Sequence, residues 1–120
     1  MTVTEATSRA GEYLVAYRLE MAGIRTVHVN MSGPDLWCHT PSGRIISVQV
    51  KASASPAPQD GRVYYAFYNN NSFWQANVFA FADLISGYVI FEPTMSKRRK
   101  IQVEAFTQEQ MQSSIARFFY

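Results

Sequence analysis

The residues of this chain whose types and spacing could do chemistry are Asp35, Gln49 and Lys51. They supply a carboxylate, an amide oxygen and an ammonium group. Oxygen ligands of this kind bind hard divalent cations, and a neighbouring ammonium group can hold a water molecule or offset a negative charge. The pattern therefore predicts a site for a divalent cation and a water, if the fold brings the three side chains together.

A hairpin is the element that must do this. Two short runs with strand character, residues 36–40 and 45–50, flank Thr40-Pro41-Ser42-Gly43, where proline and glycine are typical of a tight turn. This turn places Asp35 across from the Val48 to Gln49 region of the second strand. Side chains of a strand alternate between its faces, so we expect Ile46, Val48 and Val50 to enter a core and Ser47, Gln49 and Lys51 to share the other face.

Glu12 is the fourth candidate, on a helix that we expect to begin near Thr7 or Ser8 and to end at Gly23. The main apolar stripe of this helix would be Ala10, Tyr13, Leu14, Tyr17 and Met21. Glu12 falls on the opposite side, among Val15, Ala16 and Leu19, and a carboxylate buried there needs a partner, such as a metal site or Lys51. The alternative is that Glu12 only favours the positive end of the helix dipole.

Taken together, Asp35, the Gln49-x-Lys51 pair and Gly11-Glu12 on an upstream helix resemble the signature of the PD-(D/E)XK nuclease superfamily. Small archaeal-type Holliday-junction resolvases and compact phage or intron-encoded nucleases look most similar, over roughly residues 8–92. One position departs from the commonest pattern, because most members carry Glu before x-Lys. Some branches of the superfamily use Gln, as this chain does at Gln49.

The resemblance implies a role for each residue in Mg²⁺-dependent hydrolysis of DNA, with Mn²⁺ as a substitute metal. Asp35 would be the central metal ligand, Gln49 a neutral ligand, and Val50 would lend its backbone carbonyl. Lys51 would orient or help to deprotonate the nucleophilic water, and Glu12 would complete the site. Since Gln49 removes one negative charge from the ligand set, we expect weaker Mg²⁺ binding than in a fully carboxylate site.

The remainder of the chain predicts an α/β fold with a mixed central β-sheet flanked by helices, as in a restriction-endonuclease-like core. Residues 77–82 are continuously apolar, as a buried central strand would be. Thr107 and Gln110 have capping-box spacing at the start of a last helix, whose apolar face is Met111, Ile115, Phe118 and Phe119. Further strands are expected at 25–30, 62–68, 88–91 and 101–106, with a Ser/Pro-rich loop over 52–58 and a polar break or short helical turn over 69–75.

Lys97, Arg98, Arg99 and Lys100 form the one basic run, which we expect to be a loop that binds DNA phosphates. The alternative is a solubilising turn. The aromatic cluster of Tyr64, Tyr65, Phe67 and Tyr68 could stack on bases. Aromatic strands more often form a core or a subunit interface, and we favour either of these over base stacking.

Composition sets wider bounds. The chain has 120 residues, is 48% hydrophobic and carries a formal net charge of only +2, which predicts one folded domain over residues 1–120 rather than a polycation. The single Cys38 excludes an internal disulfide and suits a reducing compartment. We see no signal peptide and no run long enough to span a membrane, and expect a cytoplasmic protein.

Three functions compete. The first is a metal-dependent DNA endonuclease, acting on branched DNA as the resolvase resemblance implies, and homodimeric if it makes two cuts. The second is a nuclease-fold protein that binds DNA or a protein partner without cutting, which Gln49 favours. The third is an unrelated small α/β interaction module in which the motif is coincidence.

Overall fold

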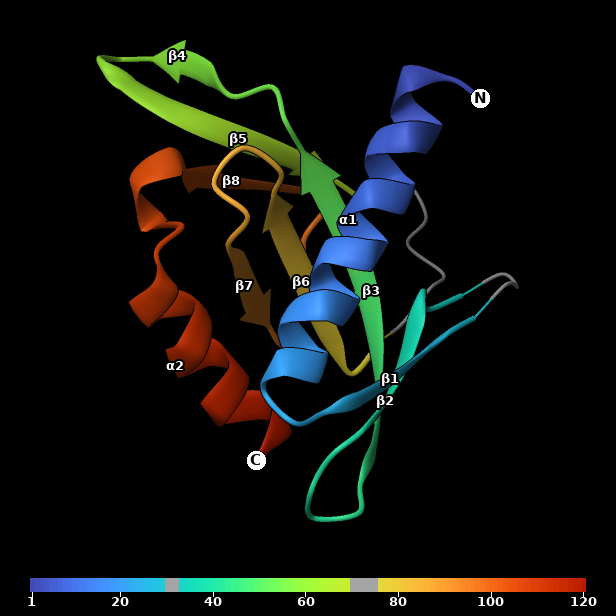
Figure 1. Ribbon diagram of the computed structural model, residues 1–120. Coiled ribbons are helices and arrows are strands. Elements are labelled where there is room, and N and C mark those ends of the chain that lie inside the picture. Colours follow the sequence, from blue (N-terminus) through green and yellow to red (C-terminus); the bar gives the residue numbers. More distant parts are fainter. Residues whose placement is uncertain (30–32, 70–75) are drawn as a thin grey trace.

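Two helices and two β-sheets make up the computed structural model, which describes residues 1–29, 33–69 and 76–120 (Figure 1). The elements in chain order are α1 (Val3–Met21), β1 (Arg25–His28), β2 (Leu36–His39), β3 (Ile45–Ser53), β4 (Ala57–Gln59), β5 (Arg62–Tyr68), β6 (Val78–Asp83), β7 (Val89–Glu92), β8 (Arg98–Gln102), a 3₁₀ turn (Val103–Ala105) and α2 (Gln108–Phe119). The main sheet has the order β1-β2-β3-β6-β7, and the smaller sheet has the order β4-β5-β8. Only β3 and β6 pair in parallel, so the predicted mixed central sheet is confirmed.

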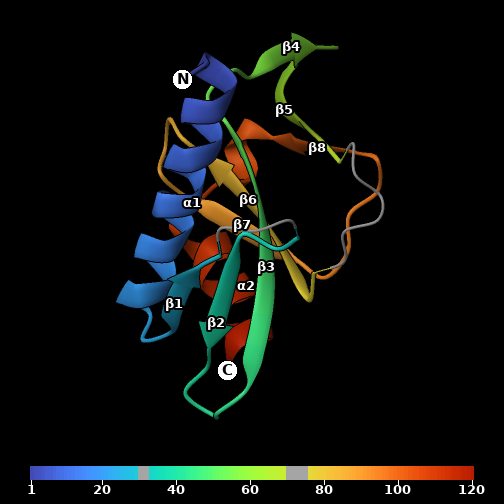
Figure 2. The same ribbon diagram turned by 90° about the vertical axis from the view of Figure 1, so that its right-hand side faces the viewer.

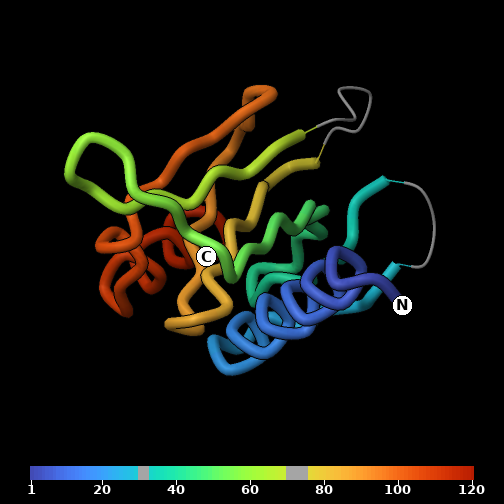
Figure 3. Tube along the Cα trace, turned by 90° about the horizontal axis from the view of Figure 1, so that it is seen from above, coloured from blue at the N-terminus to red at the C-terminus, as the bar shows by residue number. Residues whose placement is uncertain are grey.

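The two faces of the main sheet are covered differently. Both helices pack on one face, where Val78, Ala80 and Ala82 of β6 join the larger apolar cluster. Phe79 and Phe81 point to the other face and pack against the smaller sheet. Figures 2 and 3 show α1 and the β5–β8 pair on opposite sides of β3. Covering on both faces explains why β6 is apolar from Val78 to Ala82, but strands, not helices, cover the second face.

The predicted hairpin is present with the predicted register. Leu36 pairs with Val48, and β2 and β3 are antiparallel. The turn is closed by a hydrogen bond of 3.0 Å from the Gly43 N–H to the Thr40 carbonyl. Gly43 has φ +90°, a left-handed conformation that a glycine adopts without steric cost. The turn chemistry therefore set the strand pairing, as expected from the sequence.

The prediction for α1 was wrong in two respects. The helix begins at Val3, because Thr2 and Glu5 form a capping box five residues upstream of the expected start. Its buried face consists of Gly11, Val15, Ala16 and Leu19, whereas the expected stripe is largely exposed, with Tyr13 58% and Met21 72% accessible. Small residues face the sheet because they allow the helix to approach it closely. Within the described ranges, no helix combines the length and the apolar character that crossing a bilayer requires.

Two expected loops contain strands. The basic run was predicted as a loop, but Arg98 to Lys100 begin β8, which pairs with β5. The Ser/Pro-rich segment is shorter than expected, because β3 continues to Ser53 and β4 begins at Ala57. The partners of β8 and of the extended part of β3 lie far away in sequence, whereas β4 forms a tight hairpin with β5. The expected break over 69–75 falls almost wholly outside the described residues.

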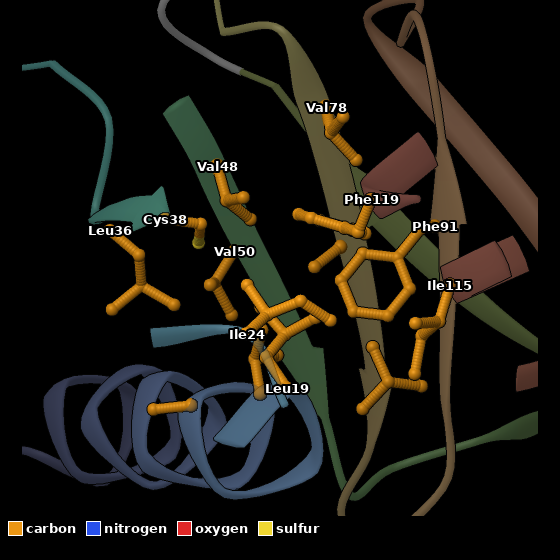
Figure 4. Packing of buried hydrophobic residues seen from close by; sticks show 14 of the residues in the cluster. Leu19, Ile24, Leu36, Cys38, Val48, Val50, Val78, Phe91, Ile115 and Phe119 are labelled. Carbon is orange, nitrogen blue, oxygen red and sulfur yellow. The ribbon is translucent and has the colours of Figure 1, made fainter. Parts of the chain in front are cut away.

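Gly11 is where α1 lies closest to the sheet. A Cβ at this position would overlap the Cβ of Ala52 on β3 and lie 3.4 Å from Cγ1 of Val50. Figure 4 shows the core that this approach brings together, with Leu19 and Ile24 beside Val50 and with Phe91, Ile115 and Phe119 from β7 and α2. The next residue is Glu12. The close contact of α1 with β3 therefore also fixes the position of Glu12 relative to β3.

We expect Gly11→Ala to destabilise the protein by about 1–3 kcal/mol, because the added methyl group overlaps Ala52 and the helix must move away. The higher helix propensity of alanine offsets about 1 kcal/mol of this cost. Chemical denaturation of Gly11→Ala, Ala52→Gly and the double variant measures the effect. If Ala52→Gly relieves the overlap, the double variant should lose less free energy of unfolding than the two single variants lose in sum. Additive free energies of unfolding would show that this contact does not limit the packing.

Candidate functional site

The candidate site lies where β3 extends beyond its hairpin partner. β2 pairs with β3 only from Ile45 to Val48, so the edge of β3 that faces β2 is open from Gln49 onwards. Asp35, one residue before β2, lies at this opening. Its own backbone is held on both sides, with its N–H 2.9 Å from the Val48 carbonyl and its carbonyl 3.0 Å from the Val29 N–H. The carboxylate is therefore presented by a fixed piece of backbone.

One carboxylate oxygen of Asp35 accepts a backbone hydrogen bond from β3 at a position where β2 no longer pairs with it. Oδ2 accepts a hydrogen bond of 2.8 Å from the Val50 N–H and one of 3.0 Å from Nε2 of Gln49. The N–H and C=O of one strand residue point to the same side, so the Val50 carbonyl faces the same opening. Burial raises the pKa of the Asp35 carboxyl, against the lowering effects of the Val50 N–H, Lys51 and His28.

Gln49 and Lys51 share one face of β3, as the alternation predicted. Both are half-buried, while the alternating residues Val48 and Val50 are in the core. Burial lowers the pKa of the Lys51 ammonium, and the charge of Asp35 partly opposes this shift. Among the described residues no ion pair within 4.0 Å joins Lys51 to a carboxylate. The Lys51 ammonium group therefore interacts with the charge of Asp35 at longer range without forming a salt bridge with it.

Glu12 reaches the same place from α1. Its pKa is raised, first by burial and then by the negative charge of Asp35, while Arg9 has the opposite effect. Because the helix begins at Val3, Glu12 lies in its interior and not in the first turn, so the helix-dipole alternative is wrong. Asp35 thus lies at the sheet edge with Glu12 of α1 near it on one side and Gln49 and Lys51 of β3 near it on the other.

His28 is a neighbour of this site that the sequence reasoning missed. Its Nδ1 lies 4.0 Å from Oε1 of Glu12, and its ring lies 5.1 Å from that of Tyr13, centroid to centroid. A pocket of about 330 Å³ opens here, lined by Arg9, Glu12, Tyr13, His28 and Val29. The signal in the sequence was only that His28 ends a strand next to the hairpin, which is too weak to single it out.

The donor set suits a hard divalent cation. The Asp35 carboxylate, the Gln49 amide and the Val50 carbonyl lie at the opening and offer oxygen, and Glu12 lies near Asp35. Both acids are half-buried, and the charge of Asp35 raises the pKa of Glu12, so a cation beside Asp35 would relieve that cost. No group of three or more His, Cys, Asp or Glu residues suited to a metal occurs in the described part of the chain. Coordination would therefore depend on Gln49 and the backbone as well as on the acids.

The other predicted functional residues lie apart from this centre. Lys97 precedes β8, and Arg98 to Lys100 are part of it, in the smaller sheet. Cys38 is wholly buried in the core, where burial raises the pKa of its thiol to about 12. It is therefore a packing residue.

No family model matches the chain, and no curated protein matches it. The architecture is nevertheless shared with an endonuclease. The solved structure of a bacterial homing endonuclease, I-Ssp6803I, is similar to this chain with a TM-score of 0.65 and 13% sequence identity. The similarity covers 83% of this chain and 78% of that chain. At this level of identity the likeness shows the fold alone.

Proposed function

We propose that this protein is a Mg²⁺-dependent DNA endonuclease of the PD-(D/E)XK type. The observation that supports the proposal is the position of Asp35 at the open edge of β3, bonded to Gln49, near Lys51 of the same strand and near Glu12 of α1. The similar fold of a bacterial homing endonuclease supports it. Four polar groups at one strand end do not serve packing, but they are suited to phosphodiester hydrolysis.

In this proposal Asp35 and Glu12 hold the cation, together with the side-chain oxygen of Gln49 and the carbonyl of Val50. The cation, when bound, supplies Lewis-acid catalysis, making water a better nucleophile and offsetting the charge that develops on the phosphate. Lys51 has the role of orienting the attacking water and contacting a phosphate oxygen. Its lowered pKa makes proton exchange with water easier than for an exposed lysine.

The direct test is to incubate the protein with four-way-junction, linear duplex and single-stranded DNA, in Mg²⁺, in Mn²⁺ and in EDTA. We expect cleavage in either metal and none in EDTA. Preference for the junction would support a resolvase-like role, and equal cleavage of linear duplex would exclude it. The absence of cleavage on every substrate in both metals would overturn the proposal.

Gln49 offers a test of the ligand set that does not depend on activity. Adding a third acid by Gln49→Glu should tighten Mg²⁺ binding on the order of tenfold, because the charge of the ligands tunes affinity in such sites. Without metal, the new carboxylate should lower the melting temperature, since it lies beside Asp35. Melting curves at increasing Mg²⁺ measure both effects. Equal Mg²⁺ affinity in the two proteins would contradict the role of Gln49 as a ligand.

A second candidate function is binding of DNA without cleavage. The observation in its favour is that Gln49 directs its amide N–H, not its oxygen, to Asp35 at 3.0 Å. This bond occupies one lone pair of the proposed central ligand. Retained binding of junction or duplex DNA, with no cleavage in either metal, would favour this function over the first.

Two further parts of the proposal follow from its chemistry. Two cuts in a duplex require two sites, so we propose a homodimer, and light scattering of the purified protein tests it. The single, wholly buried Cys38 suits a reducing compartment such as the cytoplasm.

A further inference from the structure

The outer face of the smaller sheet has a regular pattern of cations and tyrosines. In the β5–β8 register, Ala66 lies opposite Lys100 and Tyr68 opposite Arg98, and opposed residues share a face. Tyr65, Phe67 and Ile101 belong to the buried inner face. The outer face therefore carries Arg62, Tyr64, Tyr68, Arg98, Lys100 and Gln102.

The cations of this face are held above the sheet by the tyrosine rings. Lys100 Nζ lies 4.8 Å from the centroid of the Tyr64 ring, and Cζ of Arg98 lies 5.8 Å from that of Tyr68. Such contacts fix the direction of a long side chain without neutralising its charge. In its favoured orientation the amide of Gln102 accepts a hydrogen bond from Arg62 and donates one to Glu104.

Arg99, in the middle of the same basic run, has a different role. It points to the inner side and donates to both oxygens of Glu92, with Nε–Oε1 2.9 Å and Nη2–Oε2 3.0 Å. This bidentate pair ties β8 to β7 and cancels the charge of Arg99. The basic run is thus divided by the alternation of β8 into outward cations and an inward structural one.

The outer face lies on the same side of the main sheet as the candidate site. Gln49 pairs with Phe79 and Lys51 with Phe81, and both phenylalanines pack against the inner face of the smaller sheet. Gln49 and Lys51 therefore share the face of β3 that is on the side of the smaller sheet. The smaller sheet and α1 lie on opposite sides of β3 (Figure 2). A polyanion that reached the candidate site could also reach this face.

We propose that the outer face of the β5–β8 pair binds the sugar–phosphate backbone of duplex DNA through Arg98, Lys100 and Arg62. This inference rests on the proposed function for its choice of polyanion. Cations and tyrosine hydroxyl groups are typical donors to phosphate oxygens. A second copy of the chain fits less well, because a two-fold interface would set these three cations against the same three.

The test uses the Asp35→Asn background, so that binding is measured without cleavage, and a fluorescent linear duplex in EDTA over a range of salt concentrations. Removing two phosphate contacts with Arg98→Ala/Lys100→Ala should lower the slope of log affinity against log salt by about 2. The matched control is Arg25→Ala/Arg117→Ala, which removes the same charge from exposed positions on other elements and should leave the slope unchanged. An equal slope in the two double variants would overturn the inference.

Two more measurements keep the result unambiguous. Arg98→Lys/Lys100→Arg keeps both charges and should keep the slope of the wild-type chain. This variant tests the role of the charges even if the alanine variant folds poorly. A change of mass in light scattering with an unchanged slope would identify the face as a contact between copies and overturn the inference. Cleavage by the wild-type protein is scored separately. A protein that cleaves DNA but shows no slope change refutes only this inference, and a slope change without cleavage refutes only the proposed endonuclease.

Discussion

Asp35→Asn is expected to lower DNA cleavage by about 10³-fold or more, because it removes the charge around which the site is built. Asparagine keeps the size of the side chain, and its oxygen can still accept from the Val50 N–H. The pKa of Asp35 is raised in the folded protein, so ionisation of this group favours the unfolded state as the pH rises above its ordinary value. Removing the charge should therefore not lower the stability at neutral pH.

Single-turnover cleavage and melting curves together test this expectation. Asp60→Asn is the matched control, since Asp60 is exposed in the turn before β5 and has φ +52°, which asparagine tolerates. Addition of Mg²⁺ should raise the melting temperature of the wild-type protein and of Asp60→Asn, but not of Asp35→Asn. Full activity of Asp35→Asn, or an equal Mg²⁺ shift in all three proteins, would contradict the proposed site.

Asp83→Ala is expected to cost about 3–5 kcal/mol of stability, and so to lower the melting temperature by roughly 10–20 °C. Asp83 is only 1% exposed at the end of β6. Its oxygens accept from the Ile85 N–H at 2.9 Å, from the Ser86 N–H at 3.2 Å and hydroxyl at 2.7 Å, and from the buried Tyr65 hydroxyl. Alanine would leave the Tyr65 hydroxyl without a partner in the core and would remove the acceptor of the more exposed Ile85 and Ser86 donors.

The companions of Asp83 provide graded controls in thermal and chemical denaturation. Ser86→Ala removes one donor and should cost about 1 kcal/mol, while Tyr65→Phe removes the donor that joins the two sheets and should cost about 1–2 kcal/mol. The pKa of Tyr65 is raised by burial and by its bond to Asp83, so the phenol stays protonated and continues to donate. A loss below 1 kcal/mol in Asp83→Ala would show that water replaces the carboxylate.

The part of the site that depends on local pairing was predictable. The turn residues and the period-2 alternation of residues 45–50 sufficed to place Asp35 beside Gln49, and the observed register agrees. The proposed position of Glu12 near Asp35 also agrees with the structure, although its reason was a resemblance and a helix face. In each case the information lies in spacing along a strand or a helix, which the backbone geometry converts directly into a direction in space.

The parts that failed depend on contacts between distant segments. Tyr13, Tyr17 and Met21 form the more apolar stripe of α1, yet the sheet is met by the smaller face that contains Gly11 and Ala16. The fit of a helix on a sheet depends on the volumes of the side chains that face each other, here those of α1 opposite Val50 and Ala52. The periodicity of apolar residues carries no information about these volumes. The position of His28 beside Glu12 likewise depends on how α1 crosses β1.

By itself, the sequence determined the hairpin, the buried strand expected at residues 77–82 and the set of polar groups that the hairpin aligns, because these follow from turn chemistry, alternation and a continuous apolar run within a few residues. Only the tertiary structure decided that strands cover the second face of the sheet and that α1 presents its small residues. It also decided that Arg99 points inward to Glu92 while Arg98 and Lys100 point outward. These choices are made by packing between segments far apart in the chain, where shape and burial outweigh the local pattern.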